Sequence, residues 1–297
     1  NFIRAVVERY GPNGYFWSEN PSVPYVPVNT YEVWNEQNYN VNNPSWTSAG
    51  GYISEYAKFL QTVSDKIKSS VRTVSPNPQP QVKVLVGGLA ADVNISDGVS
   101  GVAYVKSLSE QSPVPGVKMR QYFDGISFHP YSGSPGQTAN QIKGLREQMD
   151  KVGFKDKAIY ITELGWATGG PVQPGLTLST EEQARYVKES MSWIKDNKTK
   201  YKIDLATWYF WRDSDEPTNP AIGLQWDSFT GLFYLDGTEK LSWKAYLDTT
   251  AEPETTIVSS YPANGATSEL RFTSNVLSSN VTSARFECRT FKWGGAV

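Results

Sequence analysis

The 297 residues carry 28 lysines and arginines against 30 aspartates and glutamates, a balance that gives no electrostatic case for binding nucleic acid or an anionic membrane. One cysteine, Cys288, and one histidine, His129, cannot build a zinc or iron site of the usual kind, so we expect no metal and no cofactor. No apolar run approaches the roughly 20 residues that span a bilayer, so we expect no membrane span.

The chain opens with the end of an amphipathic helix over residues 1–10, which a Gly-Pro pair terminates. After a loop rich in Pro, Asn and Gly, residues 28–38 alternate β-branched and aromatic side chains, which predicts a strand that ends at Asn35 and Glu36. A carboxylate at the carboxyl end of a strand is well placed to meet a ligand. Taken alone, however, Glu36 could equally be a solvated surface residue, as most glutamates are.

Helical and strand patterns then alternate along the chain. The helical spacing of apolar residues predicts helices around 56–67, 102–108, 142–152, 184–194 and 241–247, the fourth beginning at a capping box over Ser179–Glu182. Apolar runs of strand length stand at 82–89, 122–131, 158–166 and 203–211. Such alternation predicts an α/β fold with a parallel sheet and crossover helices, either open or closed into a barrel.

A second strand also ends on a glutamate, because the run that begins at Ala158 reaches Glu163 before a Gly-Trp pair. Two strand-terminal glutamates on one parallel sheet can face each other across a pocket, one as acid/base and one as nucleophile. His129, Tyr131, Trp208 and Trp211 stand at the ends of other predicted strands. The carboxyl ends of the strands form the active-site face of a (β/α)8 barrel, so the sequence favours a site there.

The pattern changes after residue 250. Residues 251–256 read as a linker, and residues 257–297 alternate polar and apolar side chains, as the start of a small all-β module does. We therefore expect two parts: an α/β domain over 1–250 and a partial all-β module over 257–297.

Four segments, "WNE", "FHPY", "TELGW" and "TWYFW", resemble the fourth, sixth, seventh and eighth strands of clan A glycoside hydrolases, which are retaining (β/α)8 glycosidases. The stretch "RYGPNGYFW…YEVWNEQN" is most similar to the family 39-like and cellulase-like branches of that clan. The resemblance covers about residues 1–250 and implies a TIM barrel that lacks about its first three β/α units. We accordingly expect the sequence to be an internal piece of a longer protein. Its tail resembles bacterial immunoglobulin-like repeats of secreted proteins, which implies a secreted or cell-surface location.

The resemblance also implies roles for individual residues. Glu36 would be the general acid/base, and Glu163 would be the nucleophile. The residues expected to bind or surround the substrate are Asn35, at the sugar 2-hydroxyl, His129 and Tyr131, below the two carboxylates, and Trp166, Trp208 and Trp211. Two simpler interpretations stay open, because His129 could be a satisfied core histidine and one of Trp208 and Trp211 could merely pack the barrel.

The expected partner is a β-linked plant-type or microbial polysaccharide or oligosaccharide. The residues do not specify its sugar, its linkage, or endo against exo cleavage. The alternative is a non-catalytic carbohydrate-binding or adhesive extracellular protein on the same scaffold, and the presence of both Glu36 and Glu163 favours the enzyme. Five strands do not close a barrel, so the resemblance does not by itself predict that this piece is active alone.

Overall fold

The computed structural model describes residues 2–39, 53–72, 81–92, 98–217 and 223–250. Contacts divide the chain into one unit over 1–249 and a second unit over 250–297. The predicted linker and the predicted β module lie outside the described residues, as does Cys288, so those expectations stay predictions.

One parallel sheet of five strands, in the order of the chain, forms the centre of the first unit. The strands are β1 Thr30–Asn35, β2 Lys83–Ala90, β3 Gly125–His129, β4 Ala158–Ile161 and β5 Ile203–Ala206. Every neighbouring pair is parallel and is joined by a crossover that contains a helix, which confirms the predicted α/β architecture. The strands end earlier than the apolar runs suggested, so Glu36 and Glu163 lie just beyond β1 and β4.

The helices are α1 Phe2–Tyr10, α2 Tyr15–Glu19, α4 Ile53–Ser70, α5 Gly101–Ser109, α6 Pro135–Lys151, α7 Thr180–Tyr201 and α8 Leu241–Thr250, with 3-10 turns η1 Met119–Gln121 and η2 Trp226–Phe229. The capping box at the start of α7 is formed as predicted. Helix α2 lies where the sequence predicted only loop. The Trp17 indole donates to the carbonyl of Tyr10 and its ring packs against Phe16 and Tyr25, so aromatic contacts rather than local propensity stabilise this turn.

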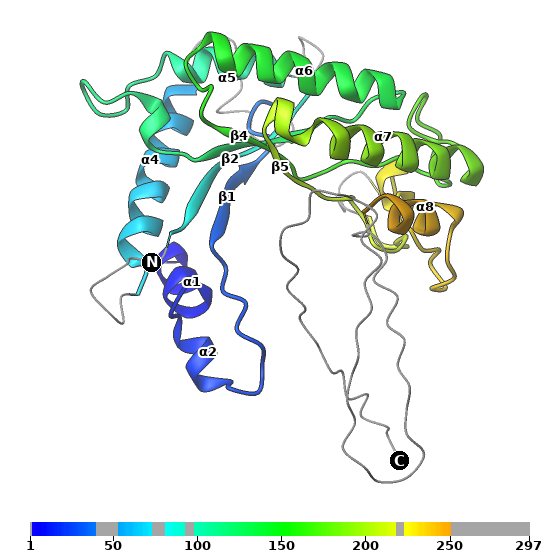
Figure 1. Cartoon of the computed structure of the whole chain (residues 1–297), viewed down its shortest axis with the longest axis horizontal. Helices are drawn as coiled ribbons and strands as arrows, with labels where there is room; N and C mark the ends of the chain where they lie inside the picture. Colours follow the sequence, from blue (N-terminus) through cyan, green and yellow to red (C-terminus); the bar gives the residue numbers. More distant parts are fainter. Residues whose placement is uncertain (1, 40–52, 73–80, 93–97, 218–222, 251–297) are drawn as a thin grey trace, which may run out of the picture. The chain divides into compact units, whose positions relative to one another are not determined.

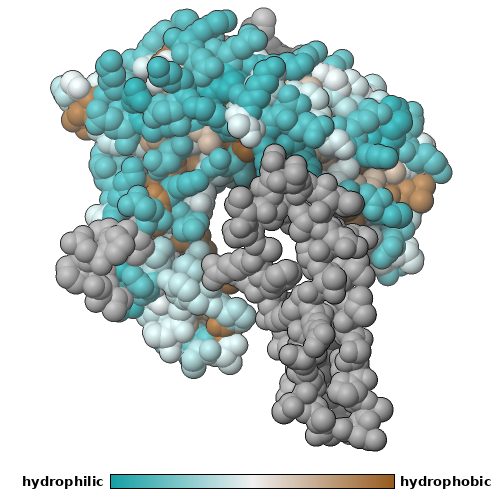
Figure 2. Space-filling view, viewed as in Figure 1, coloured by the Kyte–Doolittle hydropathy of each residue, from teal (hydrophilic) through white to brown (hydrophobic). Residues whose placement is uncertain are grey.

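Helices α4 to α7 arch over one face of the sheet (Figure 1) and bury apolar side chains such as Leu60 and Leu145 against it. The surface that these helices turn outward is largely hydrophilic (Figure 2). Among the helices of the described ranges, none combines the length and apolar character needed to cross a membrane.

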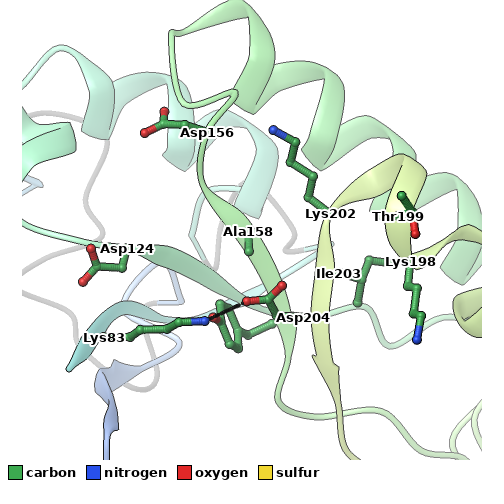
Figure 3. Close-up of a pocket in the computed structure, with 10 residues that line it drawn as sticks. Lys83, Asp124, Asp156, Ala158, Lys198, Thr199, Lys202, Ile203 and Asp204 are labelled. Carbon is green, nitrogen blue, oxygen red and sulfur yellow. Dashed lines mark hydrogen bonds and ion pairs between the residues drawn. The ribbon is translucent and has the colours of Figure 1, made fainter. Parts of the chain in front are cut away.

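The opposite face of the sheet is strongly concave, and contacts between strands that are not neighbours show this. Lys83 on β2 donates to Asp204 on β5 at 2.9 Å (Figure 3), and both groups are within hydrogen-bond distance of the Tyr160 hydroxyl. Near the other ends of the strands, the Thr162 hydroxyl donates to Glu32 on β1 at 3.2 Å. A flat sheet would hold strands three places apart at roughly 14 Å. The sheet therefore curls as part of a (β/α)8 barrel does, and the concave face corresponds to the barrel interior.

Candidate active site

The chain leaves β1 in a tight turn that places Glu36. Glu36 has a φ of 47°, a left-handed conformation that costs a non-glycine residue about 1–3 kcal/mol unless its surroundings hold it. Two buried amides supply that support: Gln37 donates to the carbonyl of Gly87, and Asn38 both donates to the carbonyl of Ala90 and accepts from its N–H. The Gln-Asn pair after Glu36 is therefore structural, a role that the sequence analysis did not assign.

His129 ends β3 and stands between the two glutamates with 1% of its surface exposed. Its Nδ1 lies 3.0 Å from Glu36 Oε1 and 3.4 Å from Glu163 Oε2. One carboxylate oxygen of each glutamate and one ring nitrogen all lie within 4.8 Å of one another. Gly88 on β2 makes room for the ring, because a Cβ there would sit 1.9 Å from Nε2. His129 is thus buried, as a core histidine would be, and it also contacts both glutamates, as a site residue would.

Glu163 has a second partner on its other side, since the hydroxyl of the half-buried Tyr131 donates to Glu163 Oε2 at 3.1 Å. The rings of Tyr209 and Trp226 stand edge-on to Tyr131, with centroids 6.1 Å and 5.4 Å away. Neither aromatic residue was singled out from the sequence. Tyr209 lies within "TWYFW", whereas nothing local marks Trp226, which comes from the 3-10 turn η2.

A third carboxylate lies beneath the imidazole. Thr162 Oγ1 is 3.1 Å from His129 Nε2, and the Thr162 hydroxyl donates to Glu32 Oε1. The N–H of Gly88 donates to the same oxygen at 2.6 Å. The sequence analysis missed Glu32 and Thr162, although a carboxylate inside the strand that ends at Glu36 was the signal available.

Burial and mutual charge perturb the acids of this cluster. Burial is the main reason that the pKa of Glu163 is raised, and His129 and the Tyr131 hydroxyl oppose the rise. Crowding of its carboxyl group by protein atoms likewise raises the pKa of Glu32, although the residue is open to solvent on the concave side. Burial alone would lower the pKa of His129, but its hydrogen bond to Glu36 and the charge of Glu163 outweigh burial and raise it.

The remaining predicted site residues differ in how far they are exposed to solvent. Asn35 is exposed at the end of β1, next to Glu36. Trp208 is nearly buried and donates to the carbonyl of Thr230, whereas Trp211 is 61% exposed in a cluster with the rings of Phe233 and Trp243. The expectation that Trp166 binds substrate requires correction. Trp166 is completely buried and its indole donates to the carbonyl of Ser132, so in this structure it packs the core.

Within the described ranges, Glu36, His129 and Glu163 form the one group of three acidic, His or Cys side chains whose atoms lie close enough to approach a shared cation. Each of these side chains is engaged by hydrogen bonds to protein groups, His129 with Glu36 and Thr162, and Glu163 with Tyr131. The expectation of no metal and no cofactor stays a prediction.

No protein-family model matches this sequence, and no curated protein matches it. Solved structures match its fold. A monomeric β-xylosidase from Caulobacter crescentus CB15 is 19% identical, with a TM-score of 0.50 and coverage of 84% of this chain and 46% of that chain. A family 39 glycoside hydrolase from Bacteroides cellulosilyticus WH2 is 18% identical, with a TM-score of 0.50 and coverage of 80% and 43%. An α-L-arabinofuranosidase from Thermotoga maritima is 13% identical, with a TM-score of 0.51 and coverage of 82% and 45%.

This chain therefore has a fold similar to part of these glycoside hydrolases and spans less than half the length of each of the three. At such low identity the likeness concerns the fold alone, and the chemistry has to be argued from the residues of this site.

Proposed function

We propose that this chain carries the catalytic centre of a retaining glycoside hydrolase that cleaves O-glycosidic bonds by double displacement. The observation that carries the proposal is the convergence of Glu36 and Glu163, which bring carboxylate oxygens within 4.8 Å of each other from strand ends 127 positions apart in the sequence, 163 − 36. Retaining enzymes hold their carboxyl groups about 5–5.5 Å apart, whereas inverting enzymes leave about 6.5–9.5 Å for a water molecule. The observed spacing favours retention.

The proposed mechanism has two steps. Glu36 donates its proton to the glycosidic oxygen while a Glu163 oxygen attacks the anomeric carbon, so the bond to the leaving group breaks as the bond to Glu163 forms. The ionised Glu36 then takes a proton from water, whose oxygen attacks the anomeric carbon and releases Glu163. Both enzyme carboxyl groups return to their starting states, and no other reactant is needed.

Hydrogen bonding supports this division of roles. A phenol donates a hydrogen bond more strongly to an ionised carboxylate than to a carboxylic acid, so Tyr131 favours the ionised form of Glu163 that a nucleophile requires. Glu36 contacts His129 at hydrogen-bond distance, and an imidazole can either accept a proton or donate one. The reverse assignment would ask Glu163 to hold a proton beside a donor that opposes it.

The substrate class proposed is a β-linked plant-type or microbial polysaccharide or oligosaccharide. Aromatic rings at the site support a carbohydrate, because Tyr209 and Trp226 stand beside Tyr131 and present surfaces of the kind on which sugar rings stack. The structural neighbours are described as a β-xylosidase and an α-L-arabinofuranosidase, among others, so pentosides are reasonable first substrates to test.

A panel of 2-fluoro aryl glycosides tests the proposal, with intact-mass measurement of the protein. One sugar should add to the wild-type protein and to Glu147→Gln, a control at an exposed position on α6, but not to Glu163→Gln. The reactive glycoside then names the sugar and the nucleophile together. Labelling that persists in Glu163→Gln refutes the assignment. Binding of sugars without any labelling in the wild type supports the carbohydrate-binding alternative instead.

A further inference from the structure

One side of His129 meets a polar chain that the double-displacement mechanism does not use. Its Nε2 faces away from the two glutamates and lies 3.1 Å from Thr162 Oγ1. Thr162 in turn donates to Glu32, whose oxygen also accepts from the N–H of Gly88. Glu32 comes from β1 and Thr162 directly follows β4, so strands from opposite sides of the concave face meet beneath one imidazole.

The proton positions in the hydrogen bonds from His129 through Thr162 to Glu32 follow from which of these groups can only accept. A threonine hydroxyl has one proton, and an ionised carboxylate only accepts. When Glu32 is ionised, the Thr162 proton points to Glu32 and the Thr162 oxygen must accept from His129, which requires a proton on Nε2. In neutral His129, Nδ1 then carries a lone pair.

That lone pair lies 3.0 Å from a carboxylate oxygen of Glu36. Two acceptors at this distance attract each other only when a proton lies between them, so with Nε2–H in place the Nδ1 and Glu36 atoms must share one further proton. The other tautomer would donate from Nδ1–H and would favour an ionised Glu36, which cannot act as an acid. The tautomer of His129 therefore matters to the first catalytic step.

We propose that Glu32, acting through Thr162, is a positioning residue that keeps one proton of His129 on Nε2, so that Nδ1 and Glu36 share the proton that the first catalytic step requires. The catalytic consequence rests on the proposed glycosidase function, whereas the tautomer does not depend on it. The titratable groups that face His129 are Glu36, Glu163, Glu32 and the Tyr131 phenol.

The surroundings of Glu32 itself are consistent with an ionised carboxylate. It accepts from the N–H of Gly88 and from the hydroxyl of Thr162, and it attracts the imidazole of His129. Two donors on one oxygen favour the ionised form and offset part of the effect of burial.

The single histidine of the chain allows a direct test, because every imidazole ¹⁵N signal belongs to His129. On the basic side of its titration, wild-type protein should show a protonated Nε2 and a bare Nδ1. Thr162→Val removes the acceptor and should move the proton to Nδ1, while Thr162→Ser should restore it to Nε2. Thr62→Val, on the exposed side of α4, should leave the spectrum unchanged.

The charge of Glu32 is tested in the same spectra. Glu32→Gln keeps an acceptor of similar shape and removes the charge, so the pKa of His129 should fall by roughly half a pH unit, less than the 1–3 units of a charge in direct contact. A neutral wild-type His129 with its proton on Nδ1, or no change of tautomer in Thr162→Val, overturns the proposal. An unchanged pKa in Glu32→Gln removes Glu32 from it.

Kinetics separate positioning from a merely structural role. With a poorly acidic phenol as leaving group, Thr162→Val should lower kcat about tenfold with little change in KM, because protonation limits that step. With a strongly acidic phenol, which leaves without protonation, the loss should nearly vanish. Equal losses for both leaving groups refute the catalytic consequence. A wild-type protein that shows the Nε2–H tautomer but hydrolyses no glycoside refutes the proposed function and leaves the tautomer assignment standing.

Discussion

Replacing Gly88 with alanine should disable the site while leaving most of the fold in place. The added Cβ would lie 1.9 Å from Nε2, 2.4 Å from Cε1 and 2.7 Å from Cδ2 of His129. Nonbonded carbon atoms prefer about 3.5–4.0 Å, so the ring must move by roughly 1.5 Å. Such a shift breaks the contacts of the ring with Glu36 and Thr162, which are 3.0 Å and 3.1 Å long.

The magnitude follows from two separate effects. A misplacement of about 1 Å can cost roughly 100-fold in rate, and overpacking a buried position costs about 1–3 kcal/mol of stability. We expect kcat/KM of Gly88→Ala to fall by at least about 100-fold and the melting temperature to fall by roughly 2–12 °C, from about 2–4 °C per kcal/mol for a domain of this size.

The assay compares initial rates on the aryl glycoside found by labelling and melting temperatures from far-UV circular dichroism. Gly136→Ala on α6 is the matched control, because a Cβ there meets nothing within 4 Å. It should keep the wild-type rate and a melting temperature close to that of the wild type, because the position lies in the first turn of α6 and the added methyl group meets no neighbour. A Gly88→Ala protein within about twofold of wild-type activity would refute the role of this glycine as space for the imidazole.

Three further changes have defined outcomes. Tyr131→Phe removes a hydrogen bond that lowers the pKa of Glu163, so the pKa of Glu163 should rise further. The acidic limb of the pH–rate profile should then move to higher pH and kcat/KM should fall about 10- to 100-fold. An acidic limb at the same pH as in the wild type would contradict this. Lys240→Met leaves Asp213 buried without its partner at 2.7 Å and should cost about 3–5 kcal/mol in urea unfolding, much of which Asp213→Asn should recover in the double variant. Lys83→Met, in a half-exposed ion pair, should cost less than about 1 kcal/mol; a cost equal to that of Lys240→Met would show that burial does not set these energies.

The sequence was most informative where the signal is local. An apolar run that ends on a carboxylate identifies both a strand and a candidate site residue, which is why the five strands and the positions of Glu36 and Glu163 could be predicted. Burial is a different matter, because it depends on what packs over a residue. Trp166 follows Glu163 by three residues, close enough in the sequence to suggest a site residue, yet it is completely buried and its ring packs against Tyr186 and Trp208.

Local sequence patterns do not show which residues meet across the folded sheet. Glu32 meets Thr162 only because the sheet curls, and Trp226 reaches Tyr131 from a turn with no periodic pattern. Helix α2 was missed for a related reason, since its five residues are too few for helical periodicity to be visible.

The curl of the sheet also determines when the site can form during folding. The contacts that define the concave face join residues 93, 121 and 130 positions apart: Glu36 with His129, Lys83 with Asp204, and Glu32 with Thr162. Helices form within about a microsecond, whereas contacts between such distant positions require long loops to close and dominate the folding time. The cluster of Glu36, His129 and Glu163 should consequently be among the last native features to appear, so recovery of the proposed activity would report complete folding in a way that helix content does not.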